Sequence, residues 1–218
     1  MHIVIPYVTS PHNELKYALR SIEKFQSGSK VLLVGDKPDW YVGEYLYHTR
    51  NDLTKQLNVL NKIIAAIPLV SDDFILWYDD LFQLHPIAII NSHYGTLKEA
   101  AAKKNLGQWF QANVENTMKI YPGGLYYGNH RPIVINGVKF KEAMNVDWNK
   151  DYLVKSLYGN YVNEPCCFEP DCKFRIGDIR EFIKGKTFLS TDHITSTEIK
   201  LLEELFPDDS HYEKRNIN

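Results

Sequence analysis

The amino-acid sequence predicts an α/β protein with a mixed, mostly parallel sheet flanked by helices. Two short, β-branched apolar runs, residues 2–8 and 30–34, enclose a segment with the spacing of an amphipathic helix. A second amphipathic segment leads into a third apolar run at 74–77. Strands joined through helices in this order are typically parallel neighbours. No repeat or linker divides the 218 residues, so a single domain over 1–218 is expected.

The first half of the chain is predicted to alternate strands with helices. Each helical segment carries an apolar stripe and begins near a residue that can cap it. Asn13 is the expected cap of the first helix, and Asn51 or Asp52 that of the second. The expected elements are strands at 2–8, 30–34 and 74–77 and helices at 13–25 and 51–67, with an irregular aromatic stretch at 39–49.

The second half is predicted to be less regular. Residues 121–132 are rich in glycine and aromatic side chains, which is typical of a substrate-facing loop. Asn136-Gly137 between apolar residues predicts a hairpin turn. Thr195 and Glu198 have the spacing of a capping box and predict a helix there. The remaining expected elements are helices at 94–119, 139–144, 150–158 and 196–206, a hairpin at 132–138, a strand at 186–190, and a strand or connector at 86–90.

Composition limits the partners. Lys and Arg number 25 against 27 Asp and Glu, and this net charge of -2 gives no overall basic field for unspecific binding of duplex DNA. A local basic groove is compatible with it. Aromatic residues suit stacking on sugars or bases, and equally an aromatic core. The absence of a signal peptide or long apolar run, with cysteines only at Cys166, Cys167 and Cys172, favours a cytoplasmic protein with reduced thiols and no membrane span.

The main functional feature is Asp79-Asp80, which follows the apolar strand at 74–77 directly. Two adjacent carboxylates at the end of a buried strand repel each other and lose hydration, and a divalent cation removes both costs. A charged turn is the alternative. Asp36 ends a neighbouring strand, and the carboxyl ends of parallel strands are where open α/β sheets bind ligands. Asp72 and Asp73 lie at the opposite end of their strand and are expected to be solvated.

The order of these features resembles the first part of GT-A glycosyltransferases. Ile3-Val4-Ile5-Pro6-Tyr7, with the helix that follows, is similar to that family's opening strand and helix. Asp36 stands where the fold contacts the nucleotide base. Asn61-x-x-x-Ala65 leading to Tyr78-Asp79-Asp80 is similar to the segment ending in the family's Asp-x-Asp-type motif. The resemblance covers roughly residues 2–90.

The resemblance implies one GT-A-like domain, with a nucleotide-sugar-binding half at 1–90 and an irregular acceptor-side half at 91–218. The donor would be a nucleoside-diphosphate sugar, expected to be UDP-linked, and Mn²⁺ or Mg²⁺ would neutralise the leaving group. Asp80 would bind the metal directly, and Asp79 would reach the ribose or a metal-bound water. His193, or its neighbour Asp192, is the candidate for a further metal ligand late in the chain.

The resemblance also implies the side chains that bind the donor. Asp36 would hydrogen-bond the base, and Tyr7 would stack on it or line its pocket. Arg50 or Lys62 could face the diphosphate, with solvated helix residues as the alternative. The full set of expected donor-binding residues is Pro6, Tyr7, Asp36, Arg50, Asn61, Lys62 and Asp79.

The catalytic base is left open by the sequence. An inverting mechanism needs a carboxylate or a histidine to deprotonate the acceptor hydroxyl. Asp147, Asp151 and Glu164 lie in the acceptor-side half, and nothing in their spacing selects one. His130 could contact the acceptor or the phosphates. A retaining mechanism is equally open. The candidate catalytic residues are Asp79, Asp80, Asp147 and His130.

A narrower resemblance supplies rival functions. Asp72-Asp73-Phe74 with Tyr78-Asp79-Asp80-x-Phe82 looks like the acidic segment of Stealth-type capsular polysaccharide phosphotransferases, although that family usually has Asn in place of Tyr78. Small phage-encoded and bacterial sugar transferases share the pattern. The acceptor would be a glycan or, for a phage-type enzyme, a hydroxylated DNA base. A noncatalytic nucleotide- or carbohydrate-binding module is the alternative from a different class.

Overall fold

A five-stranded sheet in the order β3-β2-β1-β4-β7 forms the centre of the computed structural model, which describes residues 1–49, 54–103, 107–191 and 194–214. The first four of these strands run parallel, and β7 is antiparallel to β4. The predicted mixed, mostly parallel sheet is therefore confirmed. The strands are β1 (His2–Tyr7), β2 (Lys30–Gly35), β3 (Glu44–Tyr47), β4 (Asp73–Leu76) and β7 (Ile133–Asn136).

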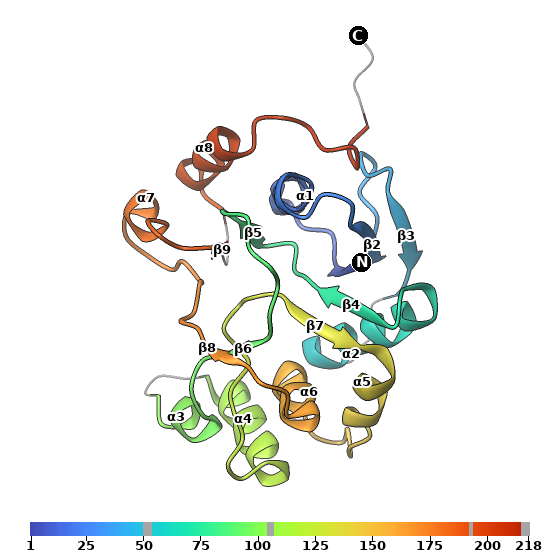
Figure 1. Ribbon diagram of the computed structural model, residues 1–218, viewed down its shortest axis with the longest axis vertical. Coiled ribbons are helices and arrows are strands. Elements are labelled where there is room, and N and C mark those ends of the chain that lie inside the picture. Colours follow the sequence, from blue (N-terminus) through green and yellow to red (C-terminus); the bar gives the residue numbers. More distant parts are fainter. Residues whose placement is uncertain (50–53, 104–106, 192–193, 215–218) are drawn as a thin grey trace.

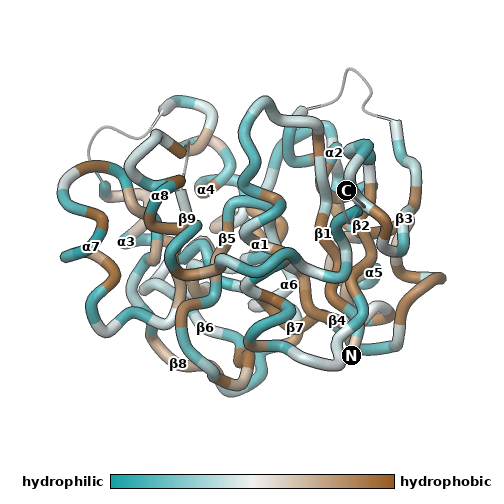
Figure 2. Tube along the Cα trace, turned by 90° about the horizontal axis from the view of Figure 1, so that it is seen from above, coloured by the Kyte–Doolittle hydropathy of each residue, from teal (hydrophilic) through white to brown (hydrophobic). Residues whose placement is uncertain are grey.

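Helices cover both faces of this sheet (Figure 1). Ile3 and Ile5 of β1 pack against α1 (Glu14–Phe25) on one face, whereas Val4 points to the other and packs against α2 (Lys55–Ala66). α5 (Gly137–Ala143) and α6 (Val154–Val162) complete the layer beside α2. Figure 2 shows the apolar residues concentrated along β1, β2 and β4, as expected for strands buried on both faces.

Smaller elements surround the central sheet. β5 (Leu81–Gln83) pairs antiparallel with β9 (Phe188–Ser190), so the end of the chain returns to the segment that follows β4. The other elements are the 3-10 turn η1 (Ile67–Leu69), β6 (Ser92–His93) paired with β8 (Cys167–Phe168), α3 (Leu97–Ala101), α4 (Gln108–Ile120), α7 (Ile179–Phe182) and α8 (Ser196–Leu205). No helix of the described residues is both long and apolar enough to cross a membrane.

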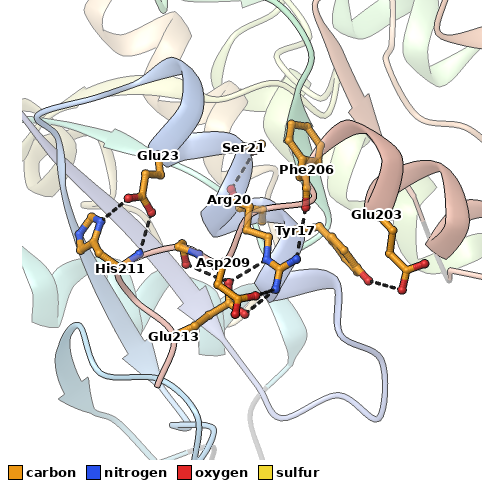
Figure 3. A network of polar contacts seen from close by, with 11 residues as sticks. Tyr17, Arg20, Ser21, Glu23, Glu203, Phe206, Asp209, His211 and Glu213 are labelled. Carbon is orange, nitrogen blue, oxygen red and sulfur yellow. Dashed lines mark hydrogen bonds and ion pairs between the residues drawn. The ribbon is translucent and has the colours of Figure 1, made fainter. Parts of the chain in front are cut away.

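The segment from residue 206 to 214, here called the C-terminal strap, lies across α1 (Figure 3). Arg20 of α1 donates from Nε to Glu213 Oε1 at 2.8 Å and also bonds Asp209 and the carbonyl oxygen of Phe206. Tyr212 stacks on Tyr41, with ring centroids 6.1 Å apart. The strap therefore fixes α1 to the chain that leads into β3.

The predicted hairpin at 132–138 is wrong. β7 pairs with β4 of the distant first half, and Asn136 caps α5 by accepting a hydrogen bond from the backbone N–H of Lys139 at 3.1 Å. Asn-Gly suits a two-residue turn, but asparagine is also a favoured helix cap. The local sequence is compatible with both, and the sheet partner decided between them.

Other boundaries also differ from the prediction. α2 begins after Thr54, whose hydroxyl accepts from Leu57, whereas Asn51 and Asp52 lie outside the described residues. Asn13 precedes α1 but makes no side-chain capping bond. The helical stretch 94–119 is two helices, α3 and α4, and 86–90 is a connector. The capping box of Thr195 and Glu198 is confirmed at the start of α8.

Candidate functional site

A cleft of about 840 Å³ opens at the carboxyl ends of β1 and β4. Pro6 and Val8 line it from the end of β1, and Tyr78, Asp79 and Asp80 line it from the end of β4. The chain leaves β1 to form β2 on one side, while β4 lies on the other. Such a switch point in the strand order is where open α/β sheets bind ligands.

The amino-terminal part of α2 forms one wall of the cleft. Lys62 is almost fully buried, and its ammonium donates a hydrogen bond to the carbonyl oxygen of Tyr7 at the end of β1. Gly35, at the end of β2, has a φ of 129° and packs against this lysine, because a Cβ there would lie 2.6 Å from Lys62 Nζ. The lysine thus fixes α2 to the ends of two neighbouring strands.

Asp79 and Asp80 stand on a turn that buried residues hold. The indole Nε1 of Trp77 donates to the carbonyl oxygen of Leu81 at 2.9 Å and spans the turn. The Asp80 carbonyl accepts from the N–H of Thr191 at 3.2 Å. Burial, together with the charge of Asp80, raises the pKa of Asp79 to about 7. A positive charge beside the pair would restore the ionised form.

Lys173 supplies a positive charge to the neighbouring carboxylate, Asp80. Its Nζ lies 3.0 Å from Asp80 Oδ2, which also accepts from the hydroxyl of Ser190 at 3.4 Å. The backbone of Lys173 bridges to Ser190 of β9, so the ion pair is built into the joint between these segments. The carboxylates and the lysine form a compact charged group on the floor of the cleft.

The two aspartates also fit a magnesium or manganese ion. Both metals prefer oxygen ligands, and Mg²⁺ is usually held by one or two carboxylates plus substrate phosphates. Over the ranges 1–49, 54–103, 107–191 and 194–214, no three His, Cys, Asp or Glu side chains form a cluster that could hold a metal ion. The other coordination positions of such an ion would be open to the donor phosphates.

Further basic residues surround the acidic pair. Lys155 of α6 donates from Nζ to the carbonyl oxygen of Arg131 at 2.7 Å, and burial lowers its pKa to about 8. Arg175 and Lys55 also line the cleft. A cleft with this many cations suits a ligand with several negative charges.

His130 and Asp171 form a second polar pair in the cleft. His130 Nδ1 lies 2.8 Å from Asp171 Oδ1, which also accepts from the backbone N–H of Lys173 at 3.2 Å. Burial raises the pKa of Asp171, but the hydrogen bond and charge of His130 outweigh it and hold that pKa below its usual value. The carboxylate therefore stays ionised beside the imidazole.

Aromatic side chains form the far wall of the cleft, here called the aromatic wall: Tyr94, Phe110 and Tyr126. The rings of Phe110 and Tyr126 meet edge to face with centroids 6.1 Å apart. Lys103 Nζ lies 4.1 Å from the centroid of Tyr94. Flat rings in the same cleft as the acidic pair suit contact with the apolar face of a second substrate.

The structure brings five of the predicted site residues together on the cleft: Pro6, Lys62, Asp79, Asp80 and His130. The lining does not include Tyr7, Asp36, Asn61 or Asp147. The Tyr7 side chain is buried on the α1 face of the sheet, and Asp36 Oδ2 accepts from the N–H of Thr9 at 2.7 Å. Asp147 is exposed and accepts from Asn149. Arg50, Asp192 and His193 lie outside the described residues.

Among the charged cleft residues that the sequence prediction missed, three come from one short segment: Asp171, Lys173 and Arg175. They alternate with Cys172 and Phe174, which are both buried. Alternation with period two is the pattern of an extended segment that presents one face to a core and the other to solvent. The alternation over residues 171–175 could therefore have predicted that the three charged side chains share one face of an extended segment. It could not have shown that this face lines the cleft.

Known proteins were compared with the chain by sequence and by structure. No family model matches the sequence, and no curated protein does. The galactosyltransferase LgtC, solved in complex with donor and acceptor sugar analogs, matches with a TM-score of 0.52 and 12% identity, covering 95% of each chain. At this identity the match shows the fold alone, and the fold is GT-A-like, as the sequence resemblance implied.

Two further structures match more weakly. The glycosyltransferase GlyE of Streptococcus pneumoniae, in its apo form, gives a TM-score of 0.42 at 12% identity over 95% of this chain, which spans 60% of its length. The inositol-1-phosphate CTP transferase of T. maritima gives a TM-score of 0.47 at 11% identity. The match covers 94% of this chain and 95% of the transferase. Neither match carries an argument about function.

Proposed function

We propose that this protein is a metal-dependent glycosyltransferase that moves a sugar from a nucleoside-diphosphate donor to an acceptor hydroxyl. The expected donor is a UDP-sugar. The observation that carries the proposal is the position of Asp79 and Asp80 at the switch point of a GT-A-like sheet, inside a cleft rich in cations. A diphosphate leaving group carries several negative charges, which the site can neutralise.

Asp80 and Asp79 would hold Mn²⁺ or Mg²⁺, and the bound metal would neutralise the departing diphosphate. Lys173 and Lys155, which also line the cleft, support the same role. Pro6 and Lys62 would contact the donor directly. Arg50, Asn61, Asp36 and Tyr7 stay predicted donor ligands, and His193 stays the predicted additional metal ligand.

The aromatic wall supports a carbohydrate as acceptor, because the apolar face of a sugar ring packs well on an aromatic side chain. The combination of cations with Tyr94 and Tyr126 also favours a second candidate, a hydroxylated base in DNA, since both features bind nucleic acid. Incubation with labelled donor and either mixed oligosaccharides or hydroxymethylated DNA separates the two. Label appears in only one of these acceptors.

The test of the proposal is turnover of UDP-sugars, by hydrolysis or transfer, with and without EDTA. Asp80→Asn should reduce turnover at least 100-fold, since a neutral amide is a poor ligand for a hard divalent cation. Asp72→Asn is the matched control, because Asp72 is exposed at the opposite end of β4 and should leave turnover unchanged. Full activity in EDTA and in Asp80→Asn would remove the proposal.

Two rival functions predict different products. A sugar-phosphate transferase of the Stealth type would release a nucleoside monophosphate, whereas a glycosyltransferase releases a diphosphate. A noncatalytic binding module would bind UDP with Mn²⁺ in calorimetry but would release neither. Chromatography of the nucleotide products therefore distinguishes all three.

A further inference from the structure

We infer that His130, oriented by Asp171, is the base that takes the proton from the acceptor hydroxyl. The assignment rests on the proposed sugar transfer and extends it to the acceptor side of the cleft. It also selects an inverting reaction, in which the acceptor attacks the anomeric carbon directly.

The hydrogen bond between the two side chains sets the state of the imidazole. Asp171 is ionised and accepts at 2.8 Å from His130, so the ring proton is held on Nδ1. The other ring nitrogen, Nε2, then carries a lone pair and can accept a proton. The side chain of His130 is 37% exposed, and both residues line the cleft. A carboxylate that fixes the tautomer and stabilises the imidazolium is the arrangement of known histidine bases.

The backbone of His130 is held in an uncommon conformation. Its φ of 48° lies in the left-handed region, which a residue other than glycine seldom adopts. Three contacts hold this loop: Cys172 Sγ donates to the His130 carbonyl, Lys155 donates to the Arg131 carbonyl, and Asn129 donates to Ser92. Contacts that fix an unfavourable conformation are typical of functional positions.

The pair also lies where acceptor and donor would meet. Lys173 joins Asp171 through its backbone N–H and Asp80 through its Nζ, so one residue spans the distance between the two carboxylates. On the other side, Asp171 lies close enough to Tyr126 to add to the effect of burial in raising the pKa of that phenol. Asp171, to which His130 is bonded, therefore has Lys173 and the acidic pair on one side and Tyr126 of the aromatic wall close by.

The carboxylates that the sequence left open as bases have other roles. Asp151 accepts from the hydroxyl of Thr54 at 2.7 Å and from the indole of Trp109 at 3.0 Å. Glu164 is exposed and pairs with Lys139. Asp147 is exposed and does not line the cleft. Of the described candidates, His130 alone is both on the cleft and oriented by an ionised partner.

The proposed step is one displacement at the anomeric carbon of the donor sugar. The acceptor oxygen forms a bond to the anomeric carbon while its proton passes to Nε2 of His130. The bond from that carbon to the diphosphate oxygen breaks, and its electron pair leaves with the nucleoside diphosphate. The imidazolium, stabilised by Asp171, later returns its proton to solvent. The configuration at the anomeric carbon is inverted.

The experiment compares water with azide as the acceptor, using whichever UDP-sugar the wild-type protein hydrolyses with Mn²⁺. Azide is an anion and has no proton to lose, so it needs no base. His130→Gln should lower the hydrolysis rate about 100-fold or more and leave formation of the glycosyl azide within threefold of wild type. His130→Asn is tested in parallel, because asparagine tolerates a positive φ better. The control is His85→Asn, at an exposed position outside the cleft.

Asp171→Asn tests the positioning role. Loss of the neighbouring carboxylate lowers the pKa of an imidazole, so the acid limb of kcat/KM for hydrolysis should move to lower pH. The charged or titratable groups near the pair include Lys173, Arg175, Lys155, Cys172 and Tyr126, and all five are unchanged in this variant. A residue that only supported the fold would lower activity at every pH without moving the limb.

Two outcomes would overturn the assignment of His130 as the base, and a third would overturn the proposed function. Equal loss of hydrolysis and azide transfer in both His130 variants would assign His130 to binding or folding rather than to proton transfer. Retention of the anomeric configuration would also remove the inference. No turnover of any nucleotide sugar by the wild type would instead remove the proposed function on which it rests.

Discussion

Lys173 Nζ lies 3.0 Å from Asp80 Oδ2, so a lysine already neutralises the carboxylate that we assign to the metal. Its side chain is 6% exposed, and replacing it would leave a partly buried carboxylate without this cation. In the proposed site, the lysine and a metal ion would therefore compete for the same negative charge until the donor phosphates bind.

The first prediction follows from this competition. Lys173→Met should lower the melting temperature of the metal-free protein, because Asp80 loses its partner. Mn²⁺ should then raise the melting temperature more in the variant than in the wild type, since the ion binds a carboxylate that no lysine neutralises. Thermal unfolding with and without Mn²⁺ measures both effects. An equal Mn²⁺ shift in the two proteins would contradict the assignment of Asp80 as a ligand.

The second prediction concerns Lys155, whose pKa burial lowers from 10.5 to about 8. The unfolded chain then binds more protons than the folded protein between these two values, so stability rises as the pH increases from 8 to 10.5. Lys155→Met should remove this rise and raise the free energy of unfolding at pH 7 by about 2 kcal/mol.

The same variant should bind UDP with Mn²⁺ about tenfold more weakly, because the site loses a cation. Urea denaturation at pH 7 and pH 10, with calorimetry for binding, checks both outcomes. Lys150→Met is the control, since Lys150 is exposed and outside the cleft. A variant less stable than the wild type at pH 7 would show that the bond to the Arg131 carbonyl outweighs the cost of burying the charge.

The third prediction concerns the C-terminal strap. Burial raises the pKa of Glu213, but the hydrogen bond and the charge of Arg20 together outweigh burial. The pKa of Glu213 therefore lies below its usual value. Its contribution to stability is complete above the unfolded pKa of about 4.5 and disappears as the pH falls through the lower folded value. Glu213→Gln should therefore cost about 3 kcal/mol at neutral pH and progressively less in acid.

Urea denaturation of Glu213→Gln across pH 2 to 7 measures this loss. Arg180 and Glu204 form the comparison, because their side chains are 56% and 57% exposed. Arg180→Met should cost less than about 1 kcal/mol, as surface ion pairs do. Similar costs for the two variants would mean that the strap contributes no more than a surface contact.

The fourth prediction tests the cap of α5. Asn136→Ala should cost about 1 kcal/mol, because the N–H of Lys139 loses its acceptor. Asn136→Ser should recover most of that loss, since serine also caps helices and adds no charge beside Asp73, whose carboxylate accepts from Asn136. Chemical denaturation of both variants is the measurement, and equal losses would assign the effect to the contact with Asp73 instead.

How far the sequence predicts the fold depends on where each element finds its partners. β1, β2 and β4 are buried on both faces and appear as continuous apolar runs, so local pattern identifies them. β3 is an edge strand with exposed ends and two half-buried middle residues, and it has no apolar run. β5 and β9 are three residues long and exist because they pair across more than 100 positions. Sequence windows contain no information on such pairing.

The same reasoning applies to the site. Asp79 and Asp80 are adjacent in the chain and end a strand, so their sequence position already implies their chemistry. Asp171 and His130 are 41 residues apart and meet only because the loops around them fold together. Lys155 lies on α6, and nothing in the sequence of that helix predicts that this lysine lines a cleft. The sequence therefore identified cleft residues that are neighbours in the chain and missed those that distant segments bring together.

The C-terminal strap has a consequence for engineering. A graft that joins residues 1–90 of this chain to another acceptor-side half would remove the partners of Arg20 and the ring stacked on Tyr41. It would also leave β4 and β5 with their outer edges unpaired, because β7 and β9 belong to the second half. The predicted donor and acceptor halves are thus parts of one folding unit. Recombination between relatives of this protein would have to exchange loops and leave the strap in place.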